Sequence, residues 1–111
     1  MEKFRYCKLE VFVPEEFLPQ IQEALWAVDA GHIGAYDRCL SVSHVESMLR
    51  PLAGSEPFLG AQGELCRAEE MKVEVTCLAE KAAETVAAVK AAHPYEEPVI
   101  NVIPLWMTSF D

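Results

Sequence analysis

The chain has 111 residues, of which 51% are hydrophobic, and nine Lys or Arg against 18 Asp or Glu give it a formal charge of −9. This length suffices for one domain that buries roughly two thirds of its unfolded surface, and the apolar share excludes a disordered chain. The negative charge repels phosphate backbones and anionic lipid, so nucleic acid and membrane are excluded as expected partners, whereas cationic ligands or metal ions are compatible with it.

The N-terminus and the cysteines indicate the compartment. No apolar segment with a cleavage site follows Met1, and no run approaches membrane-spanning length, so we expect a cytoplasmic protein. The four cysteines form no C-x-x-C pair, and Cys7 and Cys77 alternate in phase with apolar strand residues. That pattern favours buried reduced thiols, with two disulfides as the alternative.

Residues 4–13 predict a strand with one buried face, because Cys7, Leu9, Val11 and Val13 alternate with polar or aromatic residues. The opposite face carries two aromatic rings among its charges, which suggests that a partner covers part of it.

A helix is predicted next, since a proline and two acidic residues at 14–16 are a helix-start signal. Pro19 leaves two entries open, a helix that begins near Leu18 or a first turn that contains the proline. We expect the helix to end at Gly31. Gly31 and Gly34 then flank an imidazole in a connector that needs left-handed or closely approached backbone.

The second half of the chain repeats this order. A second strand is predicted at 36–45, an excursion with a short hairpin of its own at 46–67, a third strand at 71–77, a helix at 79–92, a last strand at 99–103 and a tail at 106–111. The fold class is therefore α+β, a ferredoxin-like βαββαβ sandwich of one domain, 1–111. We expect an antiparallel sheet with two helices on one face and two central strands between two outer ones.

The segment His93–Pro98 gathers an imidazole, a phenol and two carboxylates between two prolines that restrict the backbone. It suits a ligand or metal site, and it equally suits a rigid reversal of the chain. In this topology the excursion leaves the sheet at the same end. The predicted ligand-binding residues are therefore Arg50, His93, Tyr95, Glu96 and Glu97. His32 lies at the opposite end, so it can join His93 only across subunits.

Several motifs occur together in order. They are Val13-Pro14-Glu15-Glu16, Gly31-His32-Ile33-Gly34 with Tyr36 and Cys39, Arg50-Pro51-Leu52 followed by Gly54, Pro57-Phe58 and Gly60, and His93-Pro94-Tyr95-Glu96-Glu97-Pro98. In this the chain resembles the domain inserted in YqfO-type proteins of the NIF-three-like family. The resemblance implies a PII- or CutA-like fold, assembly as a trimer, and ligands near 46–67 and 93–98. It implies no hydrolase or cyclohydrolase activity, because the dinuclear metal ligands of those relatives belong to the flanking domains.

Two functions follow as hypotheses. The first is a non-enzymatic, homo-oligomeric binding or regulatory module, a trimer or alternatively a dimer, since no nucleophile–base arrangement is visible. Few cations line the expected site, which disfavours ATP. The second is a divalent-metal protein, for example for zinc, using His93 with Glu97 or alternatively Glu96, joined by His32 or Cys39 of a neighbouring subunit.

Overall fold

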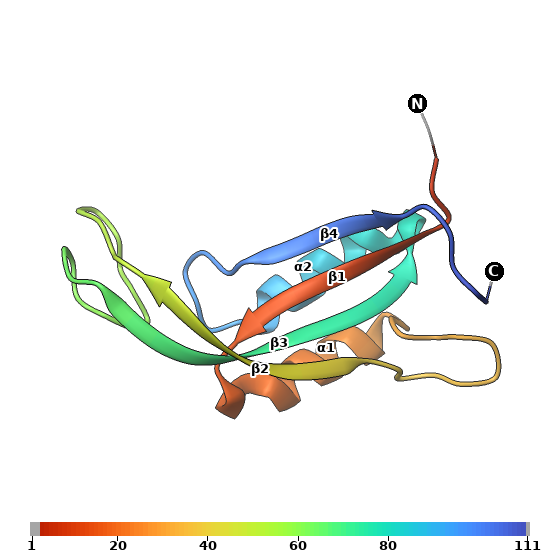
Figure 1. The fold of residues 1–111 in the computed structure, drawn as a ribbon, viewed down its shortest axis with the longest axis horizontal. Helices are drawn as coiled ribbons and strands as arrows, with labels where there is room; N and C mark the ends of the chain where they lie inside the picture. The colour runs from red at the N-terminus through yellow and green to blue at the C-terminus, as the bar shows by residue number, and fades with distance from the viewer. Residues whose placement is uncertain (1–2, 111) are drawn as a thin grey trace.

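A computed structural model describes residues 3–110 (Figure 1). Its elements are β1 Tyr6–Val13, a 3₁₀ turn Glu15–Phe17, α1 Leu18–Ala27, β2 Ser41–Leu49, β3 Cys66–Leu78, a 3₁₀ turn Ala79–Lys81, α2 Ala82–Ala92 and β4 Ile100–Leu105. None of the helices in this range is long and apolar enough to cross a membrane.

The four strands form one sheet in the order β2-β3-β1-β4, and every neighbouring pair is antiparallel. Both helices lie on one face of it (Figure 1). This arrangement confirms the predicted ferredoxin-like α+β sandwich, with β1 and β3 as the central pair.

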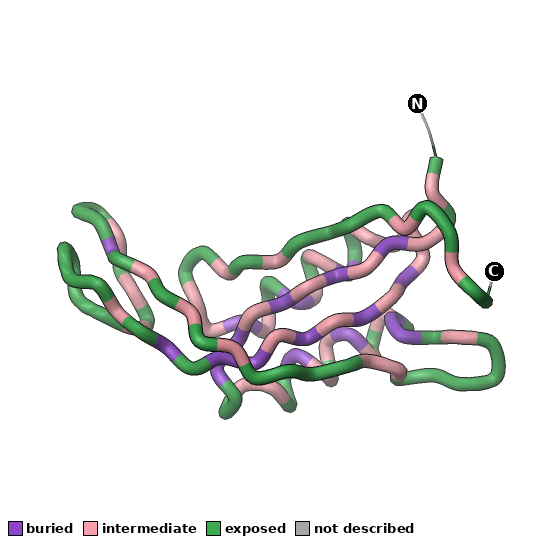
Figure 2. Tube along the Cα trace, in the orientation of Figure 1, coloured by how far each residue is buried: buried purple, intermediate pink, exposed green. Residues whose placement is uncertain are grey.

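The core lies between the helices and the two central strands (Figure 2). Leu9 and Val11 of β1 and Val73 of β3 are fully buried, and they meet Ile21 and Leu25 of α1. Burying such side chains stabilises the fold by about 1.5–3 kcal/mol each. The alternation predicted for β1 is confirmed, since its apolar face forms the floor of this core.

The opposite sheet face carries ion pairs instead of an apolar core. Lys72 Nζ lies 3.3 Å from Glu10 Oε2 and 3.2 Å from Glu74 Oε1. Of the two aromatic rings that suggested a partner, that of Tyr6 packs edge-on against Phe110, with 5.1 Å between ring centroids. The tail of the chain therefore covers part of this face itself.

α1 takes the first of the two predicted entries. It begins at Leu18 after the 3₁₀ turn, with Pro19 in its first turn, where a missing N–H costs no helical hydrogen bond. The predicted end at Gly31 was wrong. The helix stops at Ala27, because the chain turns at Asp29, which has a positive φ of 61°.

The predicted second strand was displaced. β2 begins at Ser41, because Arg38 takes a φ of 58° that interrupts extended backbone. Before it, the Gly31 N–H donates to the Thr76 carbonyl over 2.8 Å and the Cys39 N–H donates to the Gly31 carbonyl over 2.9 Å. The connector thus caps the exposed edge of β3 where β2 has not yet begun.

The predicted excursion contains more strand than expected. Pairing of β2 with β3 continues out to Leu49 opposite Cys66, so only residues 50–65 form an irregular loop. No separate hairpin lies inside it. The loop is the tip of one long β2–β3 hairpin that projects beyond the other strands (Figure 1).

All four cysteines carry free thiols, and Cys7 and Cys77 are buried as predicted. They face each other across β1 and β3 with 3.4 Å between the sulfur atoms. Burial, followed by the contact with Cys77, raises the pKa of Cys7 to about 12. Cys39 and Cys66 are only half-buried.

Candidate ligand-binding site

The buried face of β3 changes between Glu70 and Met71, which are 5% and 6% exposed. From Met71 onward the odd-numbered residues are buried beneath the helices. Before Met71 the even-numbered residues Ala68 and Glu70 are buried instead. The helix layer ends at this point, so the projecting hairpin is covered on its other face, by loop 50–65 and the link 93–98.

His93 fixes the start of that link. The ring is 8% exposed, and its Nε2 lies 2.7 Å from the Phe12 carbonyl oxygen while the backbone N–H of Tyr95 reaches Nδ1 over 3.1 Å. A backbone N–H can only donate, so Nδ1 is the acceptor of this hydrogen bond. The ring proton is therefore on Nε2, which donates a hydrogen bond to the Phe12 carbonyl oxygen. Burial lowers the pKa of His93. Both nitrogens of this neutral imidazole are therefore used within the chain.

Tyr95 connects the link to the hairpin. Its hydroxyl donates to Glu70 Oε2 over 2.6 Å. Its ring lies beside His93 on one side and Phe58 of the loop on the other, with centroid distances of 4.8 Å and 5.9 Å. Burial and then the bond to Glu70 raise the pKa of Tyr95, so the phenol keeps its proton and acts as a donor.

The loop is held against the link by Glu96, whose Oε1 accepts the backbone N–H of Glu56 over 3.0 Å. Within the loop, the Ser55 hydroxyl donates to the Leu52 carbonyl over 2.6 Å. The ring of Phe58 also packs edge-on against Phe17 before α1, with centroids 5.5 Å apart. These contacts confirm that loop and link meet at one end of the sheet.

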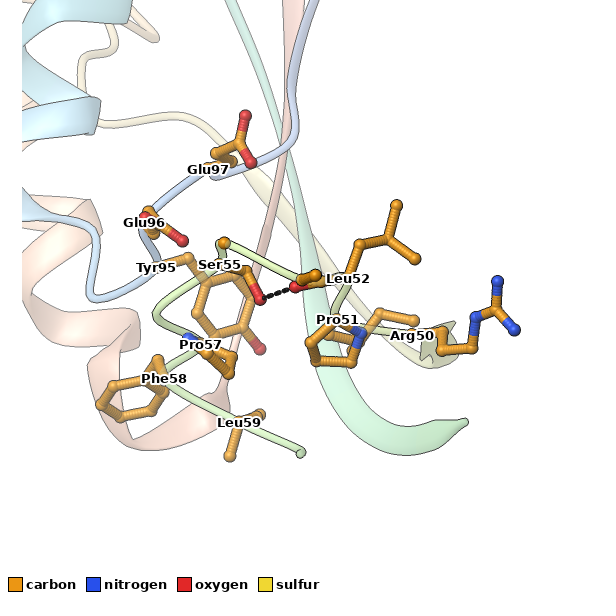
Figure 3. A pocket seen from close by; sticks show the side chains of 13 residues that line it. Arg50, Pro51, Leu52, Ser55, Pro57, Phe58, Leu59, Tyr95, Glu96 and Glu97 are labelled. Carbon is orange, nitrogen blue, oxygen red and sulfur yellow. Dashed lines mark hydrogen bonds between the residues drawn. The ribbon is translucent and has the colours of Figure 1, made fainter. Parts of the chain in front are cut away.

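A cavity of about 530 Å³ lies between them. Figure 3 shows the Tyr95 ring between the Pro51 and Phe58 sides of the loop, with Glu96 and Glu97 above it. The predicted residues Arg50, Tyr95, Glu96 and Glu97 all line this cavity. The Arg50 guanidinium extends away from the two carboxylates. His93 does not line the cavity, although its ring contacts the ring of Tyr95.

The other metal candidates lie at the far end of the sheet. His32 Nδ1 is 2.9 Å from Asp29 Oδ2, and these contacts raise the pKa of His32, led by the bond to Asp29. The Cys39 thiol contacts the Asp37 carbonyl oxygen. Within residues 3–110 no group of three or more His, Cys, Asp and Glu side chains could hold a metal ion. Residues 3–110 of one chain therefore do not place three such ligands together.

Glu70 is the site residue that the sequence did not single out. It follows Glu69 in a polar-looking stretch just before the clear alternation that starts at Met71. Nothing local marks one of two adjacent glutamates as buried. Its hydrogen-bond partner Tyr95 is 25 positions away in the chain.

The strand order, the two helices on one face and the projecting β2–β3 hairpin define a PII- or CutA-like domain. Residues 57–109 match the CutA1 divalent ion tolerance protein family. Among solved structures, the fold superposes on CutA from Archaeoglobus fulgidus with a TM-score of 0.67 at 23% identity, covering 93% of this chain and 86% of that one. CutA1 from Thermus thermophilus gives a TM-score of 0.69 at 23% identity, with 94% and 87% covered.

Sequence identity is higher to a second group of proteins, which are related to NIF3. A Bacillus cereus protein related to NIF3 is 32% identical, with a TM-score of 0.82, and the match covers 96% of this chain and 27% of that protein. A "GTP cyclohydrolase 1 type 2 homolog" from Halalkalibacterium halodurans is 42% identical over 98 residues, which are 88% of this chain. That of Bacillus subtilis is 36% identical over 91% of this chain. Over nearly its whole length the chain is thus similar to a CutA-like part of NIF3-related proteins, as its motifs predicted.

The chain spans about a quarter of the length of these curated relatives, 26% and 27% for the two named above. Their named activity belongs to proteins with much additional sequence.

Proposed function

We propose that this chain is a non-enzymatic binding module whose ligand occupies the cavity between loop 50–65 and link 93–98. The observation that carries the proposal is the cavity itself. Its volume, about 530 Å³, lies within the range of small-molecule sites, and apolar walls with a few polar groups are typical of them. The anchored Tyr95 and Glu96 supply a largely preformed geometry.

The same contacts argue against catalysis at this site. His93 would have to act as a general base through a nitrogen that is already bonded to backbone. Glu96 holds the amide of Glu56 rather than facing Glu97 as an opposed acid–base pair. These groups position the loop, which suits ligand binding without turnover.

The binding experiment titrates the chain with a panel of small organic fragments and monitors binding by the NMR chemical shifts of the backbone amides. We expect a fragment that binds the native chain to bind Phe58→Ala about tenfold or more weakly, because this change removes a cavity wall in contact with Tyr95. Leu65→Ala is the matched control, since Leu65 lies in the same loop, is 64% exposed and does not line the cavity. Equal affinity of both variants would refute the location of the site.

We further propose that the module works as a homo-oligomer, with a trimer favoured. β4 is an edge strand whose outer side is unpaired within residues 3–110, and Val102 and Ile103 are 41% and 39% exposed. Trp106 beyond it is 84% exposed. An apolar edge of this kind is an aggregation hazard unless another chain covers it.

Sedimentation at micromolar concentration measures this directly. We expect about three times the monomer mass of 12.4 kDa, with a dimer as the alternative assembly. Ile103→Glu should shift the distribution toward monomer, because it introduces a charge into the edge that a neighbouring chain would cover. A native chain that sediments as a monomer contradicts the proposal.

A second candidate function is divalent-cation binding, which the name of the matching CutA1 family favours. The described part of the chain alone does not provide a ligand set, and His93 could contribute only by giving up a hydrogen bond. A site would therefore need His32 or Cys39 of one subunit together with groups of another.

A further inference from the structure

A second cleft adjoins the proposed ligand cavity and is built around Glu70. It has a volume of about 360 Å³ and shares Tyr95, Glu97 and Leu49 with the larger cavity. Phe12 and Val99 provide apolar surface, and no Lys or Arg lines it. The cleft is therefore an apolar hollow with acidic groups and no cation.

Glu70 is 5% exposed, and a buried carboxylate normally has a cationic partner. Here the Tyr95 hydroxyl is its one hydrogen-bond donor within residues 3–110, and no Lys or Arg of this range forms an ion pair with it. Oε2 accepts this one neutral donor, while Oε1 is not among the fully buried unpaired atoms of the described residues and is therefore open to the cleft. A carboxylate beside apolar walls is stabilised most by a donor that carries a positive charge.

Tyr95 does not supply a positive charge to Glu70. Burial raises the pKa of its phenol, so it remains a neutral donor to Oε2. A ligand that complements this carboxylate would bring both a positive charge and an N–H. A metal ion needs several ligands, and the described residues offer no such group.

We propose that this cleft binds an organic ammonium ion, with the charged nitrogen on Glu70 and an apolar body against Phe12 and Val99. The inference goes beyond the proposed binding function, because it assigns a second ligand, a primary amine with a small hydrophobic group, to the cleft that adjoins the ligand cavity. Tyr95 acts as a positioning residue, because its hydroxyl holds the carboxylate in the cleft.

The test is calorimetric titration of the full chain with 2-phenylethylammonium. The comparison compounds are 2-phenylethanol, which lacks the charge, and 3-phenylpropanoate, which reverses it. Glu70→Gln keeps an acceptor for Tyr95 while removing the charge. Glu69→Gln is the matched control, because it removes the same charge from the adjacent exposed position.

We expect the ammonium to bind the native chain at least about tenfold more tightly than either comparison compound. Glu70→Gln should lose about tenfold or more of that affinity, whereas Glu69→Gln should change it less than about twofold. Circular dichroism verifies that both variants are folded.

Three results would overturn the inference. One is equal weakening by both variants, which would assign binding to the general acidity of the surface. Another is a lower assembly mass for Glu70→Gln, which would make its partner a basic side chain of a neighbouring copy. The third is absence of ammonium binding while other fragments still shift the amides of loop 50–65. That last result leaves the proposed binding function standing.

Discussion

Replacing Gly31 with alanine should destabilise the fold by about 3 kcal/mol or more, a large part of the 5–15 kcal/mol typical of a domain. Gly31 has a φ of +83°, and a Cβ there would lie 2.3 Å from the Cys39 carbonyl oxygen. Left-handed backbone costs an L-residue about 1–2 kcal/mol, and relieving the clash would break the bonds to Thr76 and Cys39.

Gly34→Ala separates the two contributions. Its φ is also positive, at +59°, but a Cβ there meets nothing within 4 Å. We expect a cost of about 1 kcal/mol, from backbone strain alone. Urea unfolding of both variants gives the difference. Equal losses would show that the connector adapts and that Gly31 does not anchor it to β3.

His93→Ala is expected to cost about 2–4 kcal/mol at pH 7.5. The change leaves the Phe12 carbonyl and the Tyr95 N–H without their partner, and an unsatisfied buried polar group costs about 1–3 kcal/mol. His44→Ala, at an exposed position on β2, should change stability by less than about 0.5 kcal/mol.

The same residue should make the fold sensitive to acid. The pKa of His93 is lowered in the folded chain, so as pH falls below about 6.5 the unfolded state takes up a proton before the folded state does. Stability is therefore fully present above that pH. Below it, the His93 contribution is lost by up to about 1.4 kcal/mol per pH unit until the folded pKa is reached.

The difference in the free energy of unfolding between the native chain and the His93→Ala variant isolates this slope, because His32 contributes equally to both proteins. Its pKa is raised, so it acts in the opposite direction as pH falls. Denaturant titrations at several values between pH 7.5 and 5 would measure the difference. A gap between the two proteins that stays constant with pH would contradict a neutral, doubly bonded imidazole at position 93.

The sequence predicted best what short-range patterns determine. β1 and the core part of β3 alternate strictly because helices bury one face of each, and the segment before His93 shows the apolar stripe of α2. The order of these elements then predicted the fold and the meeting of the excursion 46–67 with link 93–98 at one end of the sheet, and the resemblance implied the same arrangement.

The displaced start of β2 had no such signal. β2 is an exposed edge strand, so its residues do not alternate in polarity, and the positive φ of Arg38 leaves no trace in composition. Glu70 was missed for a related reason, since its hydrogen-bond partner is a distant tyrosine. The role of His93 could not be predicted either, because the same neighbouring residues are compatible with a ligand-binding histidine and with a structural one.

The location of bound fragments on the native chain tests the central claim most directly, namely that loop 50–65 and link 93–98 together form a binding site. Backbone amide shifts should concentrate at residues 52–58 and 95–97, on both segments at once, with little change around 29–39 at the far end. Shifts confined to one segment, or centred on the far end near His32, would contradict it.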